Sequence, residues 1–331
     1  MPSPLRLVFL GSDPIALPLL NWLATEGGEL ARTVAVFTQP DRPAGRGQRV
    51  EANPIKCWAL ERKIPVRQPE KLTQTEREEL ARLGADLSLV MAYGHILGVK
   101  FIETPRLGTL NLHASLLPLY RGASPIQTAI ACGERETGVS LMRIVRELDA
   151  GPVADREGVG IGPLDTAAEV EAKMGAACIP LLARTLPLLA GGGLAFSEQD
   201  PALATYCRRL SKEDGAVDFR ADAPGLAARI NGLRPWPGCS VDVNGLPVNI
   251  GLADAPPDGE RGRAEPGTVL GSDREGLLVA ALAGVLRLRK LQRPGGRMLP
   301  AADFLRGFPV QPGTRIPSQP MPVLLNARPF S

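Results

Sequence analysis

The segment Gly108-Thr-Leu-Asn-Leu-His-Ala-Ser-Leu-Leu-Pro-Leu-Tyr-Arg-Gly122 joins a buried strand to an irregular turn. Its first residues favour a pleated, buried strand, and its later proline and glycine interrupt regular structure. Asn111 and His113 are two positions apart, so their side chains lie on one face of that strand. Ligands of a parallel α/β sheet bind beyond the carboxyl ends of its strands. We therefore expect a functional site at this point of the chain.

The residues before this segment predict a parallel sheet. Residues 5–10 and 33–38 are apolar runs typical of buried strands, and residues 15–23 between them repeat apolar side chains at helical spacing. A third strand is expected over residues 86–92. This order favours a Rossmann-like α/β domain. Gly11 stands alone after the first strand, without the Gly-x-Gly-x-x-Gly pattern of dinucleotide sites, so NAD binding is disfavoured.

Capping residues and periodicity predict the other elements of this domain. Asn53 and Thr73 are suited to cap two helices that run to about residues 62 and 83. After the central segment we expect a helix at 125–131, strands at 136–145 and 153–161, and a long helix that starts at 165 or 166.

The last third of the chain changes character. A helix expected at 223–233 precedes most of a series of short β-like runs separated by turn residues, a pattern typical of a small β-barrel. The runs cover residues 217–219, 240–243, 247–252, 267–270, 276–281 and 285–291. The predicted fold class is α/β, with a Rossmann-like N-terminal domain and a C-terminal, OB-like small β-barrel. The expected parts are a first domain at 1–193, a linker at 194–209, the barrel at 210–316 and a disordered tail at 317–331.

The composition is that of an ordinary globular protein, with 44% hydrophobic and 22% charged residues in a chain of 331. No apolar run reaches the roughly 18 residues of a membrane span, and the first residues carry no signal-peptide pattern. Five scattered cysteines are typical of reduced thiols in a cytosol, and two histidines without paired cysteines argue against zinc. We expect a cytoplasmic monomer that binds neither metal nor membrane.

Basic residues concentrate in the second half and in one loop. Residues 1–206 hold 21 basic and 23 acidic side chains, a net of −2, whereas residues 207–331 hold 17 and 12, a net of +5. The stretch from Arg287 to Arg297 contains five basic residues and no acid. On charge alone, a surface that binds a polyanion and a merely soluble surface are equally good interpretations.

A basic loop follows the second strand. Residues 38–50 contain two prolines, two glycines and three arginines and predict no regular structure. The loop is either a mobile surface loop or a basic finger that reaches a large anionic substrate. Its Gly45-x-Gly47 pattern is a weak signal for a phosphate cradle, because no helix opens directly after it.

The central segment also carries a resemblance to a known family. Asn111-Leu-His113, Ser115-Leu-Leu-Pro118, Tyr120-Arg-Gly122 and Leu148-Asp149-Ala-Gly-Pro152 resemble the signature of the folate-dependent formyltransferases. That family transfers a formyl group from 10-formyltetrahydrofolate to an amine. The resemblance implies a catalytic set of Asn111, His113 and Asp149. It also implies a folate site, for which the candidates are Met91, Tyr93, Gly94, Ile96, Ser115, Leu116, Leu117 and Pro118.

The residue types suit that chemistry. Formyl transfer needs a donor for the developing oxyanion and an acceptor for the proton of the amine. Asn111 can supply the donor, and His113 can take the proton or act as an imidazolium. Asp149 can favour the charged imidazole or relay a proton through water. Taken singly, Asn111 and Asp149 are ordinary turn residues, and Leu116 and Leu117 can simply pack.

Three further segments concern the acceptor. Gln39–Gly47, Ser211–Gly215 and Arg234–Gly238 resemble the branch of the family that formylates initiator methionyl-tRNA, and the resemblance covers about residues 5–316. It departs from the usual pattern at Gly11-Ser-Asp-Pro14 and at Gln48-Arg49. If the acceptor is a tRNA, the basic loop and the basic stretch after Arg287 are expected to contact it, through Arg42, Arg46, Arg49, Arg287, Arg289, Lys290 and Arg293. The alternatives are a sugar-nucleotide formyltransferase, a formyltetrahydrofolate hydrolase and a non-catalytic RNA-binding relative. His95 is expected to line a pterin pocket or lie on the surface.

Overall fold

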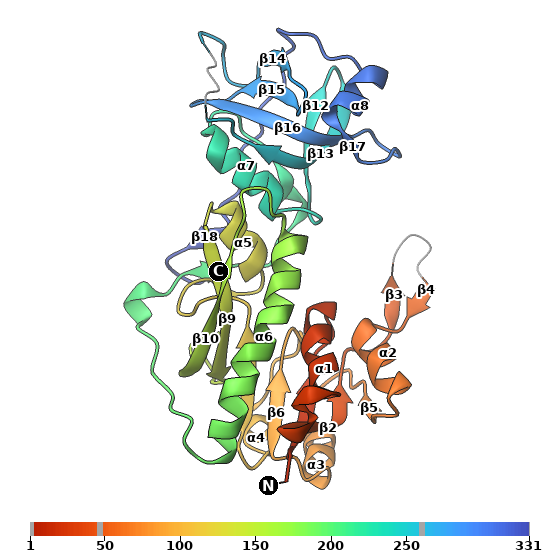
Figure 1. Cartoon of the computed structure of the whole chain (residues 1–331), viewed down its shortest axis with the longest axis vertical. Helices are drawn as coiled ribbons and strands as arrows, with labels where there is room; N and C mark the ends of the chain where they lie inside the picture. The colour runs from red at the N-terminus through yellow and green to blue at the C-terminus, as the bar shows by residue number, and fades with distance from the viewer. Residues whose placement is uncertain (1–2, 45–48, 258–261, 331) are drawn as a thin grey trace. The chain divides into compact units, whose positions relative to one another are not determined.

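A computed structural model of the chain describes residues 3–44, 49–257 and 262–330 (Figure 1). Packing divides the chain into two compact units that alternate along the sequence. The first unit comprises Met1–Arg121, Gly138–Val159 and Ala172–Ala204, and the second comprises Gly122–Thr137, Gly160–Glu171 and Thr205–Ser331. This division differs from the single boundary near residue 193 that the sequence suggests.

The first unit is built on a seven-stranded sheet of order β10-β9-β7-β6-β1-β2-β5. Its strands are β1 (Leu5–Leu10), β2 (Ala31–Phe37), β5 (Val66–Arg67), β6 (Leu87–Val90), β7 (Thr109–His113), β9 (Glu136–Arg143) and β10 (Val153–Gly160). The pairs β1–β2, β1–β6, β2–β5 and β6–β7 are parallel, and β7 pairs with β9 in antiparallel register. The predicted parallel α/β sheet is therefore confirmed, and it gains an antiparallel extension beside β7.

Local signals in the sequence predict three helices of this unit, at residues 15–23 and after the caps Asn53 and Thr73, and the structure has helical segments at these places. Its helical segments are η1 (Pro14–Ala16), α1 (Leu17–Leu23), η2 (Glu26–Glu29), α2 (Pro54–Glu61), α3 (Gln74–Arg82), α4 (Val99–Ile102) and η3 (Pro201–Leu203). The Asn53 side chain accepts a hydrogen bond from the Lys56 amide at 3.0 Å, which caps α2. Thr73 and Glu76 form a capping box at the start of α3. Both predicted caps are confirmed.

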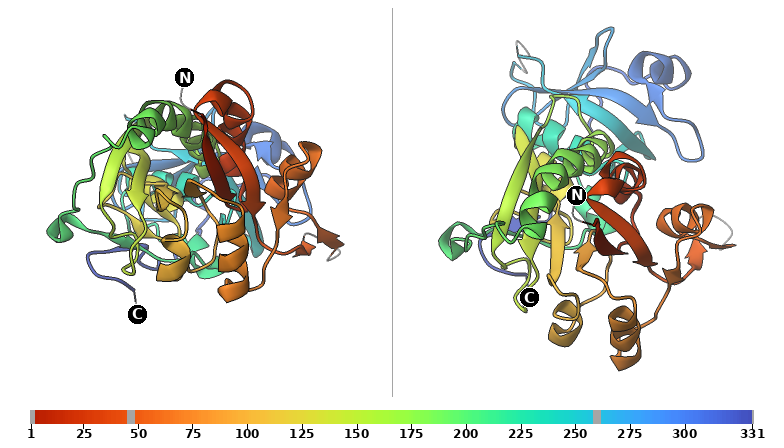
Figure 2. Two further views of the ribbon diagram at one scale, coloured as in Figure 1. Left: turned by 90° about the horizontal axis from the view of Figure 1, so that it is seen from below. Right: turned by 60° about the horizontal axis from the view of Figure 1, so that its bottom comes forward.

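The long helix α6 (Ala167–Ala190) lies alongside α1 in Figures 1 and 2. Its Met174, Cys178, Leu181 and Leu182 side chains are fully buried, and each leucine contributes roughly 1.5–3 kcal/mol by leaving water. By length and composition α6 could cross a membrane, and 44% of its most apolar window is buried inside the protein. The core helix of a soluble protein passes the same test.

The basic loop has more regular structure than the sequence predicts. Strands β3 (Arg42–Ala44) and β4 (Arg49–Glu51) pair as a two-stranded antiparallel sheet, with Arg42 opposite Glu51. At the base of this hairpin, Asp41 accepts hydrogen bonds from Lys56 and, at 2.7 Å, from Gln68. The tip, residues 45–48 with Arg46, lies outside the described residues. The expectation of a loop without structure of its own is therefore wrong at its two flanks.

The second unit contains a six-stranded antiparallel sheet of order β12-β13-β16-β15-β14, with β17 paired to β16. Its strands are β12 (Cys239–Val243), β13 (Leu246–Asp254), β14 (Val269–Ser272), β15 (Leu277–Ala280), β16 (Val285–Gln292) and β17 (Leu299–Pro300). The predicted C-terminal domain of short β-strands is therefore confirmed as an antiparallel sheet. The run Val217–Phe219 is not a strand; Val217 and Phe219 are instead buried in the core of this unit.

The remaining elements complete the second unit. They are β8 (Arg121–Gly122), α5 (Pro125–Ala131), β11 (Tyr206–Cys207), η4 (Lys212–Gly215), α7 (Ala223–Gly232), α8 (Ala301–Gly307) and β18 (Leu325–Asn326). Helix α5 packs against α7, which explains why residues 122–137 belong here. The tail is not disordered in its described part: β18 pairs with β11, and Leu324 is 5% exposed. Two arginines, Arg208 and Arg229, donate to its backbone carbonyls.

Candidate active site

The polar pair predicted on the central strand lies at the carboxyl edge of the first unit's sheet. Asn111 and His113 are the third and last residues of β7, which is parallel to its neighbour β6. The side chain of Asn111 is half-buried, whereas His113 is only 6% exposed. Because alternate residues of a strand share a face, both side chains leave the sheet on the same side. The predicted juxtaposition of these two residues is therefore present.

The imidazole of His113 is held in one orientation. Its Nε2 lies 3.0 Å from the carbonyl oxygen of Tyr120. A carbonyl can only accept, so Nε2 carries the hydrogen and the neutral ring keeps its lone pair on Nδ1. Nδ1 lies 3.6 Å from Asp149 Oδ2. This distance is longer than a good hydrogen bond, so Nδ1 faces a carboxylate without being tightly bound to it.

The fold brings Asp149 to His113 from 36 positions further along the chain. Asp149 lies in the turn between β9 and β10 with a φ of +48°. Gly151 in the same turn has no room for a side chain, because a Cβ there would lie 1.9 Å from the Arg143 carbonyl oxygen. This contact accounts for the glycine in the Leu-Asp-Ala-Gly-Pro motif.

A buried clamp supports the Asp149 turn. The Gln199 side-chain amide donates to the carbonyl oxygens of Asp149 at 2.8 Å and Gly151 at 2.7 Å. Its oxygen accepts from Arg121 Nε and Nη2 at 3.1 and 2.7 Å. Gln199 and Arg121 are 8% and 5% exposed. Sequence reasoning missed Gln199, which lies in the expected linker; the only signal was Arg121, inside the Tyr-Arg-Gly motif.

The loop after His113 is pinned by serines. Ser140 Oγ donates to the Ser115 carbonyl at 2.7 Å and accepts from the Leu117 amide at 3.0 Å, while Ser115 Oγ donates to the Leu119 carbonyl at 2.6 Å. Ser115 is fully buried, and Leu117 packs against Met142 and Val153. The Leu117 side chain therefore packs inside the protein, which is the alternative to folate contact, whereas Leu116 and Pro118 are half-buried.

The second strand end supplies the other candidates for the folate site. Met91 and Tyr93 are buried, Gly94 has a φ of +81° and Ile96 is 97% exposed. The His95 ring stacks edge-on against Tyr93 with centroids 5.0 Å apart. Among the described residues neither the Tyr93 hydroxyl nor His95 Nε2 has a hydrogen-bond partner. Burial raises the pKa of Tyr93, so its hydroxyl stays neutral and can donate.

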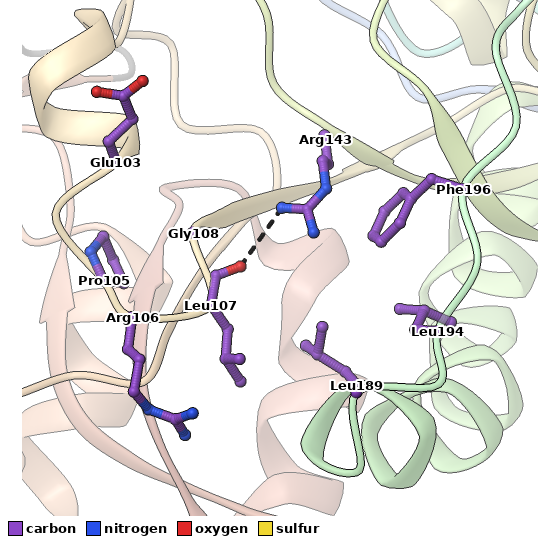
Figure 3. Close-up of a pocket in the computed structure, with 10 residues that line it drawn as sticks. Glu103, Pro105, Arg106, Leu107, Gly108, Arg143, Leu189, Leu194 and Phe196 are labelled. Carbon is purple, nitrogen blue, oxygen red and sulfur yellow. Dashed lines mark hydrogen bonds between the residues drawn. The ribbon is translucent and has the colours of Figure 1, made fainter.

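A pocket of about 390 Å³ in the same unit is lined by other residues than those of this site (Figure 3). It is lined by Gly108, which precedes β7, and by Arg143, whose partner in the sheet is Leu110 near the start of β7. The Arg143 guanidinium stacks 4.2 Å from the Phe196 ring centre. His113 is at the other end of β7, so this pocket is not the place of the predicted chemistry.

The basic residues predicted to contact tRNA differ in their surroundings. Arg42 is exposed and pairs with Glu70 at 3.3 Å, and the side chain of Arg49 is outside the described part. Arg287 is 13% exposed and pairs with Asp254, Asp273 and Glu275. Arg289 pairs with Asp254 and Glu275, whereas Lys290 and Arg293 are exposed. Carboxylates therefore match the charges of Arg287 and Arg289, which argues against direct phosphate contacts by these two.

Within residues 3–44, 49–257 and 262–330, no group of three or more His, Cys, Asp and Glu side chains could hold a metal ion.

Comparisons with known proteins bear on both units. The family model described as "Formyl transferase" matches residues 5–185, and "Formyl transferase, C-terminal domain" matches residues 209–309. A methionyl-tRNA formyltransferase of Aromatoleum aromaticum is 38% identical over 95% of this chain and 97% of its own length. Another, from Ectopseudomonas mendocina, is 41% identical over 92% and 95%.

Solved structures share the fold at low sequence identity. The complex of HypX from Aquifex aeolicus with tetrahydrofolic acid superposes with a TM-score of 0.59 at 18% identity, over 92% of this chain and 47% of that chain. WlaRD, a sugar 3N-formyl transferase crystallised with dTDP and 5-N-formyl-THF, has a TM-score of 0.63 at 16% identity, over 86% and 97%. At such identities the likeness concerns the fold alone.

Proposed function

This chain belongs to the formyl transferase family, and from that premise we infer that it transfers a formyl group from a folate cosubstrate to the α-amine of initiator methionyl-tRNA. The product is formylmethionyl-tRNA, which initiates translation. The observation that carries this conclusion is the match to methionyl-tRNA formyltransferases at 38–41% identity across both units. The alternative functions are transfer to a sugar nucleotide, hydrolysis of the formyl folate, and RNA binding without catalysis. None of them explains this full-length match to tRNA-formylating enzymes.

The donor is 10-formyltetrahydrofolate, and residues at the two strand ends fit it. A flat pterin needs an apolar wall and a few polar groups aimed at its edge. Ile96 exposes its side chain here, while the Tyr93 hydroxyl and His95 Nε2 are buried polar atoms without a partner in the described structure. Ser115 and Leu117 shape the loop through packing and hydrogen bonds, and the backbone of Gly94 and the side chains of Leu116 and Pro118 are left for contact.

Three side chains of this unit divide the catalytic work. Asn111 projects its amide from the strand end and donates to the oxyanion as negative charge develops, a contribution of about 10²–10³ in rate. His113 takes the proton of the attacking amine on Nδ1, since Nε2 is bound to the Tyr120 carbonyl. As the bond between the formyl carbon and N10 of the folate breaks, this proton passes to N10, and tetrahydrofolate leaves. Asp149, 3.6 Å away, stabilises the imidazolium that results.

The tRNA is held by basic residues of both units. In the first unit we assign this role to Arg42, Arg46 and Arg49 around the β3–β4 hairpin. In the second unit we assign it to Lys290 and Arg293, which are exposed. Arg287 and Arg289 stabilise the sheet through their ion pairs and act on RNA only indirectly.

We also expect a cytoplasmic, metal-independent monomer that does not enter a membrane. The fully buried residues of α6 support its role as a core helix, and its Pro180 and Pro187 are tolerated within that packing.

The decisive experiment is formyl transfer to charged initiator tRNA, compared with free methionine and with a sugar-nucleotide amine. Of these three acceptors, the parent protein should formylate only the charged initiator tRNA. His113→Ala should lower kcat by about 10²–10⁴ and Asn111→Ala by about 10²–10³, with folding unchanged.

His95→Ala is the matched control, because it removes the other imidazole of the chain. It should change the KM for folate and leave kcat within a few fold. A His113→Ala variant that keeps a tenth of the parent activity would rule out His113 as proton acceptor. Transfer to the sugar nucleotide instead of the tRNA would refute the proposed acceptor.

A further inference from the structure

The two family-like motifs of the second unit, Ser211–Gly215 and Arg234–Gly238, have no role in the site described above. They line one pocket of about 440 Å³, within the roughly 300–1,000 Å³ usual for ligand sites. Residues of the antiparallel sheet complete the lining, among them Ser240, Asn249 and Gln292. We call this cavity the Trp236 pocket.

The walls of the Trp236 pocket are rigidly connected. Gly215 of η4 is so close to the second motif that a Cβ would lie 2.1 Å from the Gly238 carbonyl oxygen. The carboxylate of Asp214 is fully buried and accepts from Arg208 at 2.5 and 2.8 Å and from the Ser211 amide at 2.7 Å. Burial opposes its ionisation, but these hydrogen bonds prevail and lower the pKa of Asp214. The pocket is therefore preformed, which reduces the entropy that a ligand must overcome.

The lining combines three chemical features. Trp236 is 50% exposed, whereas Trp58 is 4% exposed and Trp22 is half-buried, so Trp236 is the tryptophan that offers an accessible ring face. Arg234 and Lys212 supply positive charge, and neither forms an ion pair within the described residues. The side-chain amides of Asn249 and Gln292 are linked to each other at 3.2 Å and present donors and acceptors at the surface.

An aromatic face, cations and amides form the usual set for one unstacked nucleotide. Bases of single-stranded RNA stack on aromatic rings, their phosphates meet basic side chains, and amides read the base edges. The acidic Glu213 also lines the pocket. A hydrogen bond from the Ser211 hydroxyl lowers the pKa of the Glu213 carboxyl, which is therefore ionised. A phosphate is therefore expected beside Arg234 rather than beside Glu213.

We propose that the Trp236 pocket binds one unpaired nucleotide of the substrate tRNA, with its base stacked on Trp236 and its phosphate at Arg234. This assignment rests on the proposed function, because it takes tRNA as the substrate. It gives the two motifs a common purpose, since η4 and residues 234–238 both line one recognition site.

Fluorescence tests the pocket directly on the full-length protein. A four-nucleotide single-stranded RNA of sequence ACCA should quench the emission of the parent protein, and an RNA duplex should quench it far less. The quenching should vanish in Trp236→Leu. Trp236→Phe should bind RNA more tightly than Trp236→Leu does, and this binding is measured with labelled RNA because the reporting tryptophan is gone. Stacking of one base predicts a loss of RNA affinity of about 5- to 100-fold in Trp236→Leu.

Kinetics with charged initiator tRNA provide the second measurement. Trp236→Leu should raise the KM for tRNA by a similar factor and leave kcat and the KM for folate unchanged. Leu246→Ala is the matched control, because Leu246 is a 44% exposed apolar residue of the same unit outside the pocket. If Trp236→Leu does not fold, the parent titration and Trp236→Phe carry the test.

Three results would overturn the assignment: equal KM values for Trp236→Leu and Leu246→Ala, equal quenching by duplex and single strand, or tighter binding of a proline-rich peptide than of RNA. A parent protein that does not formylate tRNA would refute the proposed function instead, and the fluorescence titration would still report on the pocket.

Discussion

Gln199→Leu should uncouple the Asp149 turn from the body of the catalytic unit. The substitution keeps the volume of a buried side chain and removes every polar contact of the amide. It withdraws two donors from the carbonyls of Asp149 and Gly151 and the acceptor for two hydrogen bonds from the Arg121 guanidinium. Each buried group that loses its partner costs about 1–3 kcal/mol, and more where a charge is involved. Because such costs are not additive, we expect a total of about 3–5 kcal/mol.

The consequence for catalysis follows from the position of the turn. A shift of the Asp149 carboxylate by about 1 Å relative to His113 Nδ1 would lower kcat by about 10²-fold. The free energy of unfolding and kcat should be measured together, by urea unfolding and by formyl transfer at saturating folate and tRNA. Gln74→Leu is the matched control, because its amide forms an exposed hydrogen bond to Glu78 within α3, which is worth about 0.2–0.5 kcal/mol.

Gln199→Glu separates the two halves of the clamp. The carboxylate keeps the acceptor for Arg121 but cannot donate to the two turn carbonyls. We expect it to recover part of the stability and little of kcat. The reasoning is refuted if Gln199→Leu unfolds at the parent urea concentration, or if its kcat stays within threefold of the parent while stability falls.

Two further predictions concern the second unit. Lys290→Ala and Arg293→Ala should each flatten the dependence of log Kd for tRNA on log salt by about one unit. Arg287→Met should leave that slope unchanged and lower the free energy of unfolding by about 2–3 kcal/mol, because it breaks a partly buried ion-pair network. A changed slope in Arg287→Met, or a loss of stability without a changed slope in the other two variants, would contradict this difference in roles. Hydrogen bonds from Arg220 lower the pKa of Asp218 from 3.8 to about 2, so this carboxylate contributes stability above about pH 4 that is lost as the pH falls towards 2. The urea midpoint of the parent should therefore exceed that of Asp218→Asn above about pH 4 and converge with it near pH 2, and a difference independent of pH would exclude this linkage.

The local elements of the first unit could be predicted from the sequence because their causes are local. The alternation in residues 109–113 puts Asn111 and His113 on one face, and Asn53 and Thr73 cap helices through hydrogen bonds to residues two or three positions away. The βαβ order restricts the topology to a parallel sheet, whose strands end at one edge. The strand that carries Asn111 and His113, and the sheet edge where it ends, therefore follow from periodicity and connectivity.

The charge pattern and the strand-like runs of the sequence are less reliable guides to which residues contact each other in the fold. The run Arg287–Arg297 contains no acid, yet β13 and the β14–β15 turn bring Asp254, Asp273 and Glu275 to Arg287 across the sheet. The tail looks unstructured in composition but pairs with β11, and residues 217–219 have a strand-like pattern but do not form a strand. A sequence lists the charges and the apolar positions, whereas the partner of each is chosen by the path of the chain.

The candidate site divides in the same way. The resemblance in the sequence singled out Asn111, His113 and Asp149, whose side chains carry the donors and acceptors that formyl transfer needs, and their catalytic role stays a prediction. Only the tertiary structure decided that Asp149 meets Nδ1 of His113, that the Tyr120 carbonyl selects the tautomer, and that Gln199 and Arg121 hold the turn. These contacts join segments separated by 7 to 78 residues, and their geometry depends on how the sheet, the turn and the 194–209 segment pack, which no local pattern encodes.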